Sequence, residues 1–176
     1  MTDKERAVAA ARLVLNQFDV TTPPVPVEDI AHGLGARIER RADSPDISGL
    51  LYRADNDTTL IGVNADDSLV RQRFTIAHEL GHLRLHEGTP LFVDRSIRVN
   101  SRLAGESGRG GEEREANWFA AELLMPEAMI REVANQMASH RQLSDDGLVR
   151  TLADTFQVSR PAMGYRLFNL GLVNGL

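Results

Sequence analysis

The 176-residue chain contains no cysteine, which excludes disulfide bridges and thiolate chemistry. Any site for a transition metal must therefore use histidine and carboxylate side chains as ligands. Long apolar runs are also absent, since no stretch approaches the ~18 residues that cross a membrane. The first residues lead into an amphipathic helix and lack the apolar core of a signal peptide. We therefore expect a cytoplasmic protein without a membrane partner.

The chain also lacks an excess of positive charge. Its formal net charge is −5 at pH 7, which argues against a nucleic-acid footprint over the whole surface. The hydrophobic fraction of 42% supports a real core, and the length suits one domain with a small appendage. We expect residues 1–139 to form the main domain and residues 140–176 to form a C-terminal helical segment packed on it.

Against these absences stands one motif, H-E-x-x-H. His78 and His82 are four positions apart, so on a helix they project from one face, one turn apart. Two imidazoles so placed can share one tetrahedral Zn²⁺, and Glu79 can reach a water molecule in the open coordination position. Gly81 lies inside the predicted helix, where a small residue lets another element pass close to the metal. The alternative is a surface helix with two incidental histidines.

A zinc site of this type needs a third protein ligand. A third histidine in the position that some families use is missing, because position 88 is glycine and no histidine lies between His86 and His140. The alternative is a carboxylate from a second helix, which we predict over residues 112–125 after a glycine-rich turn. Four glutamates of that segment compete for the role: Glu112, Glu113, Glu115 and Glu122.

Helical phase narrows this choice. Glu113 shares an inward face with Ala116 and Asn117, and Asn117 is placed to hold the free nitrogen of a ligating histidine. Glu115 is rotated about 200° from Glu113 and should point more outward. We therefore favour Glu113 as third ligand and keep Glu115 as the second candidate. The alternative is that the glutamates solvate the helix start and complement its dipole, which we favour for Glu112 and Glu115.

Two linked blocks of sequence resemble the ImmA/IrrE family of zinc metallo-endopeptidases. Residues 74–86 read F-T-I-A-H-E-L-G-H-L-x-L-H, and residues 113–126 read E-x-E-A-N-x-F-A-A-x-L-L-M-P. Both blocks match in order and at plausible spacing. The resemblance covers residues 45–130 well and the remainder loosely.

This resemblance implies a gluzincin-like site with one zinc ion per chain. The ligands would be His78, His82 and Glu113, with Glu79 as catalytic base and Asn117 supporting a ligand from behind. Family members act in bacteria, phages and integrating elements, and several cleave a helix-turn-helix repressor. The resemblance therefore implies a protein substrate of that kind.

We expect an α+β fold with a mostly helical, zincin-like core. A small antiparallel or mixed sheet should pack on the motif helix. Further helices are predicted over residues 3–18, 27–34 and 126–137. Strands are predicted over residues 36–40, 49–53, 58–63, 91–93 and 97–99, of which the second and third form a hairpin. Residues 100–111 are predicted to be a loop. One interpretation is that an exposed edge strand there binds an extended substrate by backbone pairing. The alternative is an ordinary surface loop without catalytic consequence.

The C-terminal residues 148–170 have the rhythm of a helix-turn-helix, with Val158 and Ser159 in the turn. Residues 148–176 carry three Arg and one Asp, hence a net charge of +2. One interpretation is a module that binds DNA or docks a repressor. We favour the alternative that these helices cap the core, because a phosphate footprint usually needs more cations than Arg160 and Arg166 supply.

The function predicted from the sequence is that of a zinc-dependent regulatory endopeptidase whose substrate is a protein such as a helix-turn-helix repressor. Two alternatives remain: a metal- or signal-sensing transcriptional regulator, and a zinc hydrolase that acts on a non-protein substrate. Tyr165, His140 and Tyr52 are the candidates for stabilising the oxyanion of the reaction. His86 lies two turns from His78, too far for the same metal, and we interpret it as a supporting or structural residue.

Overall fold

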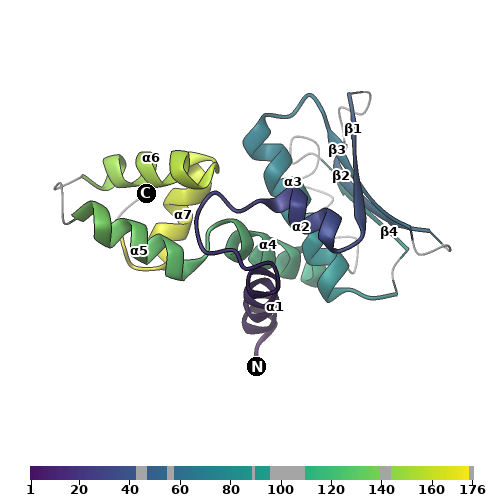
Figure 1. Ribbon diagram of the computed structural model, residues 1–176, viewed down its shortest axis with the longest axis horizontal. Helices are drawn as coiled ribbons and strands as arrows, with labels where there is room; N and C mark the ends of the chain where they lie inside the picture. Colours follow the sequence, from purple (N-terminus) through teal and green to yellow (C-terminus); the bar gives the residue numbers. More distant parts are fainter. Residues whose placement is uncertain (43–46, 55–57, 89, 96–109, 139–143, 175–176) are drawn as a thin grey trace.

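The computed structural model describes residues 1–42, 47–54, 58–88, 90–95, 110–138 and 144–174 (Figure 1). The elements in these ranges are α1 (Asp3–Gln17), α2 (Val27–Gly33), β1 (Ala36–Arg41), β2 (Ile47–Arg53), β3 (Thr59–Asn64), α3 (Leu69–Leu85), β4 (Leu91–Arg95), α4 (Gly110–Leu124), α5 (Glu127–Ala138), α6 (Asp145–Phe156) and α7 (Arg160–Asn169). The fold is α+β with one mixed sheet, as the sequence predicts. No helix of the described part is long and apolar enough to cross a membrane.

The strands of the sheet lie in the order β1-β3-β2-β4. β2 and β3 form the predicted antiparallel hairpin, in which Leu51 pairs with Ile61. β1 pairs with β3 in parallel, and β4 pairs with β2 antiparallel at the edge of the sheet. Leu51 and Ile61 are fully buried. The strand predicted over residues 97–99 lies outside the described residues.

Helix α3 packs between the sheet and the other helices (Figure 1). Ser68 caps its start, since the Ser68 hydroxyl accepts a hydrogen bond from the backbone N–H of Arg71 at 3.4 Å. Ile76 and Leu80 are fully buried within the common core. Because sheet and helices cover α3 on opposite sides, its middle turns are almost entirely enclosed, and these turns carry the H-E-x-x-H motif.

Helices α5, α6 and α7 gather at the opposite end of the molecule from the sheet (Figure 1). The turn between α6 and α7 runs through Gln157 with φ at 54°, and Ser159 caps α7. This helix pair and its short turn agree with the helix-turn-helix pattern predicted for residues 148–170. The predicted boundary at residues 139 and 140 lies outside the described residues.

Candidate metal centre

The α3 helix places the three motif side chains in the interior. His78 is 3% exposed, Glu79 is fully buried and His82 is 1% exposed. The two histidines project from the same face one turn apart, as helical geometry requires. Their Nε2 atoms lie 3.1 Å from each other.

Helix α4 brings a carboxylate to this pair of nitrogens. Glu113 Oε2 lies 3.2 Å from His78 Nε2, and Glu113 Oε1 lies 3.4 Å from His82 Nε2. One potential ligand atom from each of the three residues lies within 4.8 Å of the other two. The side chain of Glu113 is 40% exposed, so the cluster is open to solvent on the side of α4.

A close approach of α3 and α4 makes this convergence possible. Gly81 faces Ala116, and a Cβ atom at position 81 would lie 2.9 Å from the Ala116 Cα atom. Real Cβ atoms essentially never come that close to another heavy atom. The expectation that Gly81 lets another element pass near the motif is therefore confirmed, and that element is the helix carrying Glu113.

The outward nitrogens of both histidines also have partners. His78 Nδ1 lies 3.1 Å from Asn117 Oδ1. His82 Nδ1 lies 3.0 Å from His86 Nδ1, which places His86 behind a motif histidine, as predicted. Partners of this kind fix the orientation and tautomer of an imidazole that binds a metal through Nε2.

The charge states favour binding of a cation. Burial lowers the pKa of His82, and the neighbouring His78 and His86 lower it further against the opposing effect of Glu113. For Glu113, burial raises the pKa, but hydrogen bonds with His78 and His82 outweigh it and hold the pKa well below its usual range. A neutral imidazole and an ionised carboxylate are the forms that bind a metal.

Glu79 lies on the side of α3 that faces the sheet. Its carboxylate sits against Gly49 of β2, where a Cβ atom would come within 2.8 Å of Glu79 Oε1 and 2.4 Å of Thr75 Cγ2. Gly49 therefore leaves the space that this carboxylate occupies. With this space, the His-His-Glu donor set and the supporting contacts, the residues present fit a zinc ion with an acidic side chain beside it.

The expectation for Glu115 is wrong. Its carboxylate is buried, at 6% exposed, and contacts His86 Nε2 at 2.8 Å and Arg6 at 2.6 Å. The helical phase of Glu115 turns it away from α3, but this direction does not lead to solvent. Helix α1 covers this second face of α4 and encloses the carboxylate. Glu122 is likewise buried, at 2% exposed, rather than solvating the helix.

Two of the three candidates for stabilising an oxyanion have exposed side chains. Tyr165 lies on α7 with 62% of its surface exposed, and Tyr52 is 45% exposed on β2. His140 lies outside the described residues. Sequence analysis missed Phe92 of β4, whose ring stacks on His82 with centroids 4.1 Å apart. The signal for it was a single aromatic residue in a predicted short strand.

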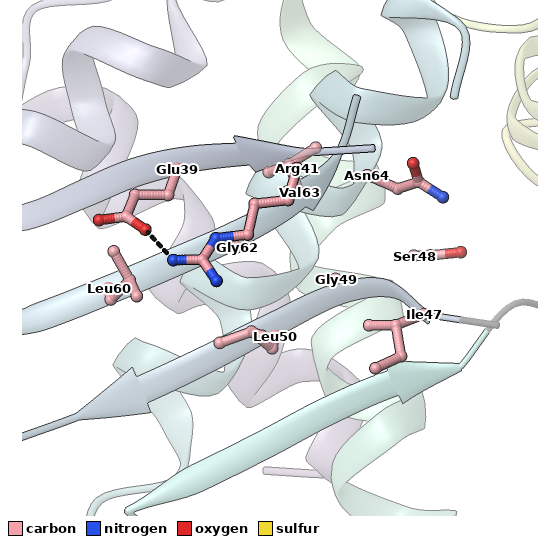
Figure 2. Close-up of a pocket in the computed structure, with 10 residues that line it drawn as sticks. All are labelled: Glu39, Arg41, Ile47, Ser48, Gly49, Leu50, Leu60, Gly62, Val63 and Asn64. Carbon is pink, nitrogen blue, oxygen red and sulfur yellow. Dashed lines mark hydrogen bonds and ion pairs between the residues drawn. The ribbon is translucent and has the colours of Figure 1, made fainter. Parts of the chain in front are cut away.

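A hollow of about 170 Å³ lies on the sheet face opposite α3 (Figure 2). It is lined by residues of β1, β2 and β3, and Arg41 and Glu39 of β1 form an ion pair beside it at 3.3 Å. Gly62 creates the depression, since a Cβ atom there would lie 2.8 Å from Leu50 Cγ. The histidine cluster lies on the other side of the sheet, so this hollow is separate from the candidate metal centre.

The chain is similar to a known protein family and to a phage protein. The model of peptidase family M78, described as the IrrE N-terminal-like domain, matches residues 31–168. The chain is also 30% identical over 86 residues to the uncharacterized immunity region protein 2 of Bacillus phage phi105. That match covers 48% of this chain and 49% of the phage protein, so the chain spans about half the length of this curated relative.

Proposed function

The chain belongs to peptidase family M78, the family of the IrrE N-terminal-like domain, and on this premise we propose that it is a zinc-dependent endopeptidase that cleaves a regulatory protein. Family membership makes the chain a metallopeptidase with a His-His-Glu metal-binding group. The observation that carries the proposal is the convergence of His78, His82 and Glu113 within 4.8 Å, with Glu79 buried on the same helix as the two histidines.

We assign His78, His82 and Glu113 as the residues that hold the metal. A bound zinc ion would polarise the scissile carbonyl group and lower the pKa of the attacking water. Zinc is favoured because the donors are two imidazoles and one carboxylate, a set common in catalytic zinc sites. The donor chemistry also accepts Mn²⁺, Co²⁺ or Ni²⁺, since affinity alone selects zinc only weakly.

Glu79 is assigned the proton transfers of peptide hydrolysis. Its carboxylate takes a proton from the water as the water attacks the carbonyl carbon, and it then delivers that proton to the departing amine. The C–N bond breaks as the amine is protonated, which leaves a carboxylic acid and an amine as products. The pocket formed by Gly49 and Thr75 holds the Glu79 carboxylate in place for both transfers.

The position of β4 at the edge of the sheet supports an extended peptide as substrate. β4 is the last strand in the sheet order, and its Phe92 side chain stacks on His82. The backbone of a peptide paired with this edge would pass beside the cluster. Alternate side chains of such a peptide face the same way, so contacts along the edge would select a sequence rather than a single residue.

An apolar recess supports the presence of a large apolar side chain near the cleaved bond. Its volume is about 260 Å³, and it lies between α3, the end of α4 and the start of α7. Phe74 lines it and is also one turn from His78, with the two ring centroids 6.1 Å apart. Burying one large apolar side chain there would contribute about 1.5–3 kcal/mol to substrate binding.

A transcriptional repressor is the substrate that we propose. The family resemblance supports it, because several family members cleave helix-turn-helix repressors. The phage relative is named for an immunity region, which is consistent with a regulatory role. We expect the repressor to be encoded beside the gene of the peptidase.

The test is incubation of the zinc-loaded protein with candidate helix-turn-helix repressors, followed by mass spectrometry of the products. Wild type should cut at one site flanked by a large apolar residue. Glu79→Gln should lower the cleavage rate by about 10²–10⁴-fold, the usual contribution of a general base, while zinc stoichiometry stays near one. Glu132→Gln, on the exposed surface of α5, serves as the matched control and should cleave normally.

Cleavage by Glu79→Gln at the wild-type rate would refute the proposed role of Glu79. A cellular response that survives this substitution would instead favour the regulator that acts without proteolysis. Direct DNA binding by the C-terminal helices is disfavoured, because Arg166 is bound to Glu122 and to the Met125 carbonyl oxygen. Retention of DNA by wild type but not by Arg160→Ala in a gel-shift assay would revive it.

A further inference from the structure

A line of buried polar contacts leads from the candidate metal centre to helix α1. It begins at His82 Nδ1, which lies 3.0 Å from His86 Nδ1. His86 Nε2 lies 2.8 Å from Glu115 Oε2, and Glu115 Oε1 accepts a hydrogen bond from Arg6 at 2.6 Å. The residues come from α3 with its C-cap, from α4 and from α1, so three separate segments meet along one line.

The direction of the protons along this line is determined by its two ends. A His82 that binds a metal through Nε2 carries its proton on Nδ1 and donates to His86 Nδ1. His86 must then carry its own proton on Nε2, which donates to the Glu115 carboxylate. Arg6 can only donate, so it ends the line on the second carboxylate oxygen. Every contact is satisfied by one assignment with a neutral His86.

We propose that His86, Glu115 and Arg6 are positioning residues that hold His82 in its metal-binding tautomer and orientation. The carboxylate pushes electron density into the His86 imidazole and through it toward His82, which makes His82 Nε2 a better electron donor to the metal. Helix α1, which carries no proposed ligand, thereby takes part in the metal site. Its start is fixed by a capping box in which Thr2 and Glu5 bond each other's backbone N–H groups.

The two ligand histidines differ in this support. His78 is held by the neutral amide of Asn117, a residue whose own surface is exposed. His82 is held by a line that ends on a carboxylate and a guanidinium, with both His86 and Glu115 buried. Charge-assisted hydrogen bonds are roughly twice as strong as neutral ones, so the hold on His82 should be the stronger.

A second ion pair between the same two helices provides a matched control. Arg12 of α1 donates to Glu122 of α4 at 2.7 Å, and their side chains are 53% and 2% exposed. Arg6 and Glu115 are bonded at 2.6 Å, and their side chains are 48% and 8% exposed. Both pairs join α1 to α4, and their distances and burial are similar. Of the two glutamates, only Glu115 contacts His86, the residue behind His82.

The experiment measures the zinc dissociation constant of the full chain by competition with a chelator. Glu115→Gln should raise it by about 10–100-fold, the usual effect of losing such a partner, and Arg6→Ala should raise it by a smaller factor. Glu122→Gln and Arg12→Ala should leave it unchanged. Unfolding of each metal-free variant in urea, followed by circular dichroism, reports any general loss of stability.

His86 is tested by a conservative pair of variants. His86→Asn keeps an oxygen near the position of Nδ1 that can accept from His82, whereas His86→Ala removes it. Zinc affinity should therefore fall further for His86→Ala than for His86→Asn. With Co²⁺ in the site, the visible absorption bands should shift for Glu115→Gln but not for Glu122→Gln, because only the first alters a ligand's surroundings.

Equal zinc affinities of the Glu115→Gln and Glu122→Gln proteins would overturn the inference, and so would losses of affinity that only follow losses of stability. The inference rests on the proposed metal site, but its failure is distinguishable from failure of that site. If wild type binds no zinc at all, the proposed function fails. If wild type binds zinc and Glu115→Gln binds it equally well, only the positioning line fails.

Discussion

The two ends of helix α4 each carry a glutamate that is held by side chains of neighbouring helices, but the partners of the two glutamates differ. Near its start, Glu113 faces the imidazoles of His78 and His82. Near its end, Glu122 is enclosed by the guanidinium groups of Arg12 and Arg166. The residue type and the helix are the same, so the difference lies in what the neighbouring helices present.

The partners decide what each carboxylate can do. Imidazole nitrogens beside Glu113 offer lone pairs of their own, and together the groups make a set that a cation can enter. Arginines at Glu122 have no lone pairs to offer and use the carboxylate oxygens as acceptors. The start of α4 is therefore suited to binding a metal, whereas its end ties together α1, α4 and α7.

The largest expected effect comes from removing the charge at the start of α4. Glu113→Gln should raise the zinc dissociation constant by more than about 100-fold, since even partners behind a ligand are worth 10–100-fold. Chelator competition measures this, with Glu112→Gln as the neighbouring control. An unchanged affinity in Glu113→Gln would mean that the carboxylate near the histidines is not a ligand, and the comparison between the two ends would collapse.

The same substitution at the other end should affect stability instead. Glu122→Gln leaves Arg12 and Arg166 without their common anion, and removing one partner of a fully buried pair costs about 3–5 kcal/mol. We expect about 2–3 kcal/mol here, because Arg12 is half exposed and the remaining charges are partly solvated. Urea unfolding gives this value, and the zinc affinity should not change. A larger loss of affinity than in Glu113→Gln would reverse the assignment of the two ends.

The substitution Gly81→Ala, on α3, tests the comparison between the two ends of α4 in another way. The new Cβ atom would meet the Ala116 backbone, so α3 and α4 must move apart at an expected cost of about 1–3 kcal/mol. Because the shift displaces Glu113 from the histidines, zinc affinity should fall as well, which sets this variant apart from Glu122→Gln. Paired measurements of stability and affinity would show it, and a change in stability alone would mean that the helix spacing does not govern the site.

The smallest expected effect is a change in how the metal-free protein responds to pH. The pKa of His82 is lowered in the folded state, so below its ordinary value of 6.5 the unfolded chain binds the proton more readily and stability falls. The pKa of Glu113 is lowered from 4.5, so its contribution to stability is present above that pH and is lost as the pH falls below it. Melting temperatures measured from pH 7 to 3 should fall less steeply for His82→Gln than for wild type just below pH 6.5. For Glu113→Gln the difference from wild type should begin only below about pH 4.5. If His82→Gln differed from wild type only at the lower pH and Glu113→Gln only at the higher pH, both assigned pKa shifts would be contradicted.

The sequence predicts the parts of the site that depend on one helix at a time. Spacing alone places His78 and His82 on one face, and helical phase separates Glu113 from the other glutamates. The buried partners of Glu115 were not predictable in this way, because Arg6 lies 109 positions earlier in the chain. Only the packing of α1 on α4 brings them together, and no periodicity within either helix indicates it.

The sheet shows the same limit. Alternation and a polar turn predict the β2–β3 hairpin, whose strands are close in sequence. The parallel pairing of β1 with β3 and the position of β4 at the edge depend on long-range order. Phe92 therefore reaches His82 through a pairing that could not be read from its own segment.

The contact between Gly81 and Ala116 has a consequence for how sequences of this fold can diverge. The nearest atom to a Cβ at position 81 belongs to the backbone of residue 116, at 2.9 Å, and not to its side chain. No exchange at position 116, even to glycine, removes that atom. Position 81 must therefore be glycine as long as the two helices keep this spacing, whichever residue occupies position 116. In a distant relative, a residue larger than glycine at this position would therefore indicate that the two helices lie farther apart. This would hold even if the histidines and the glutamate were unchanged.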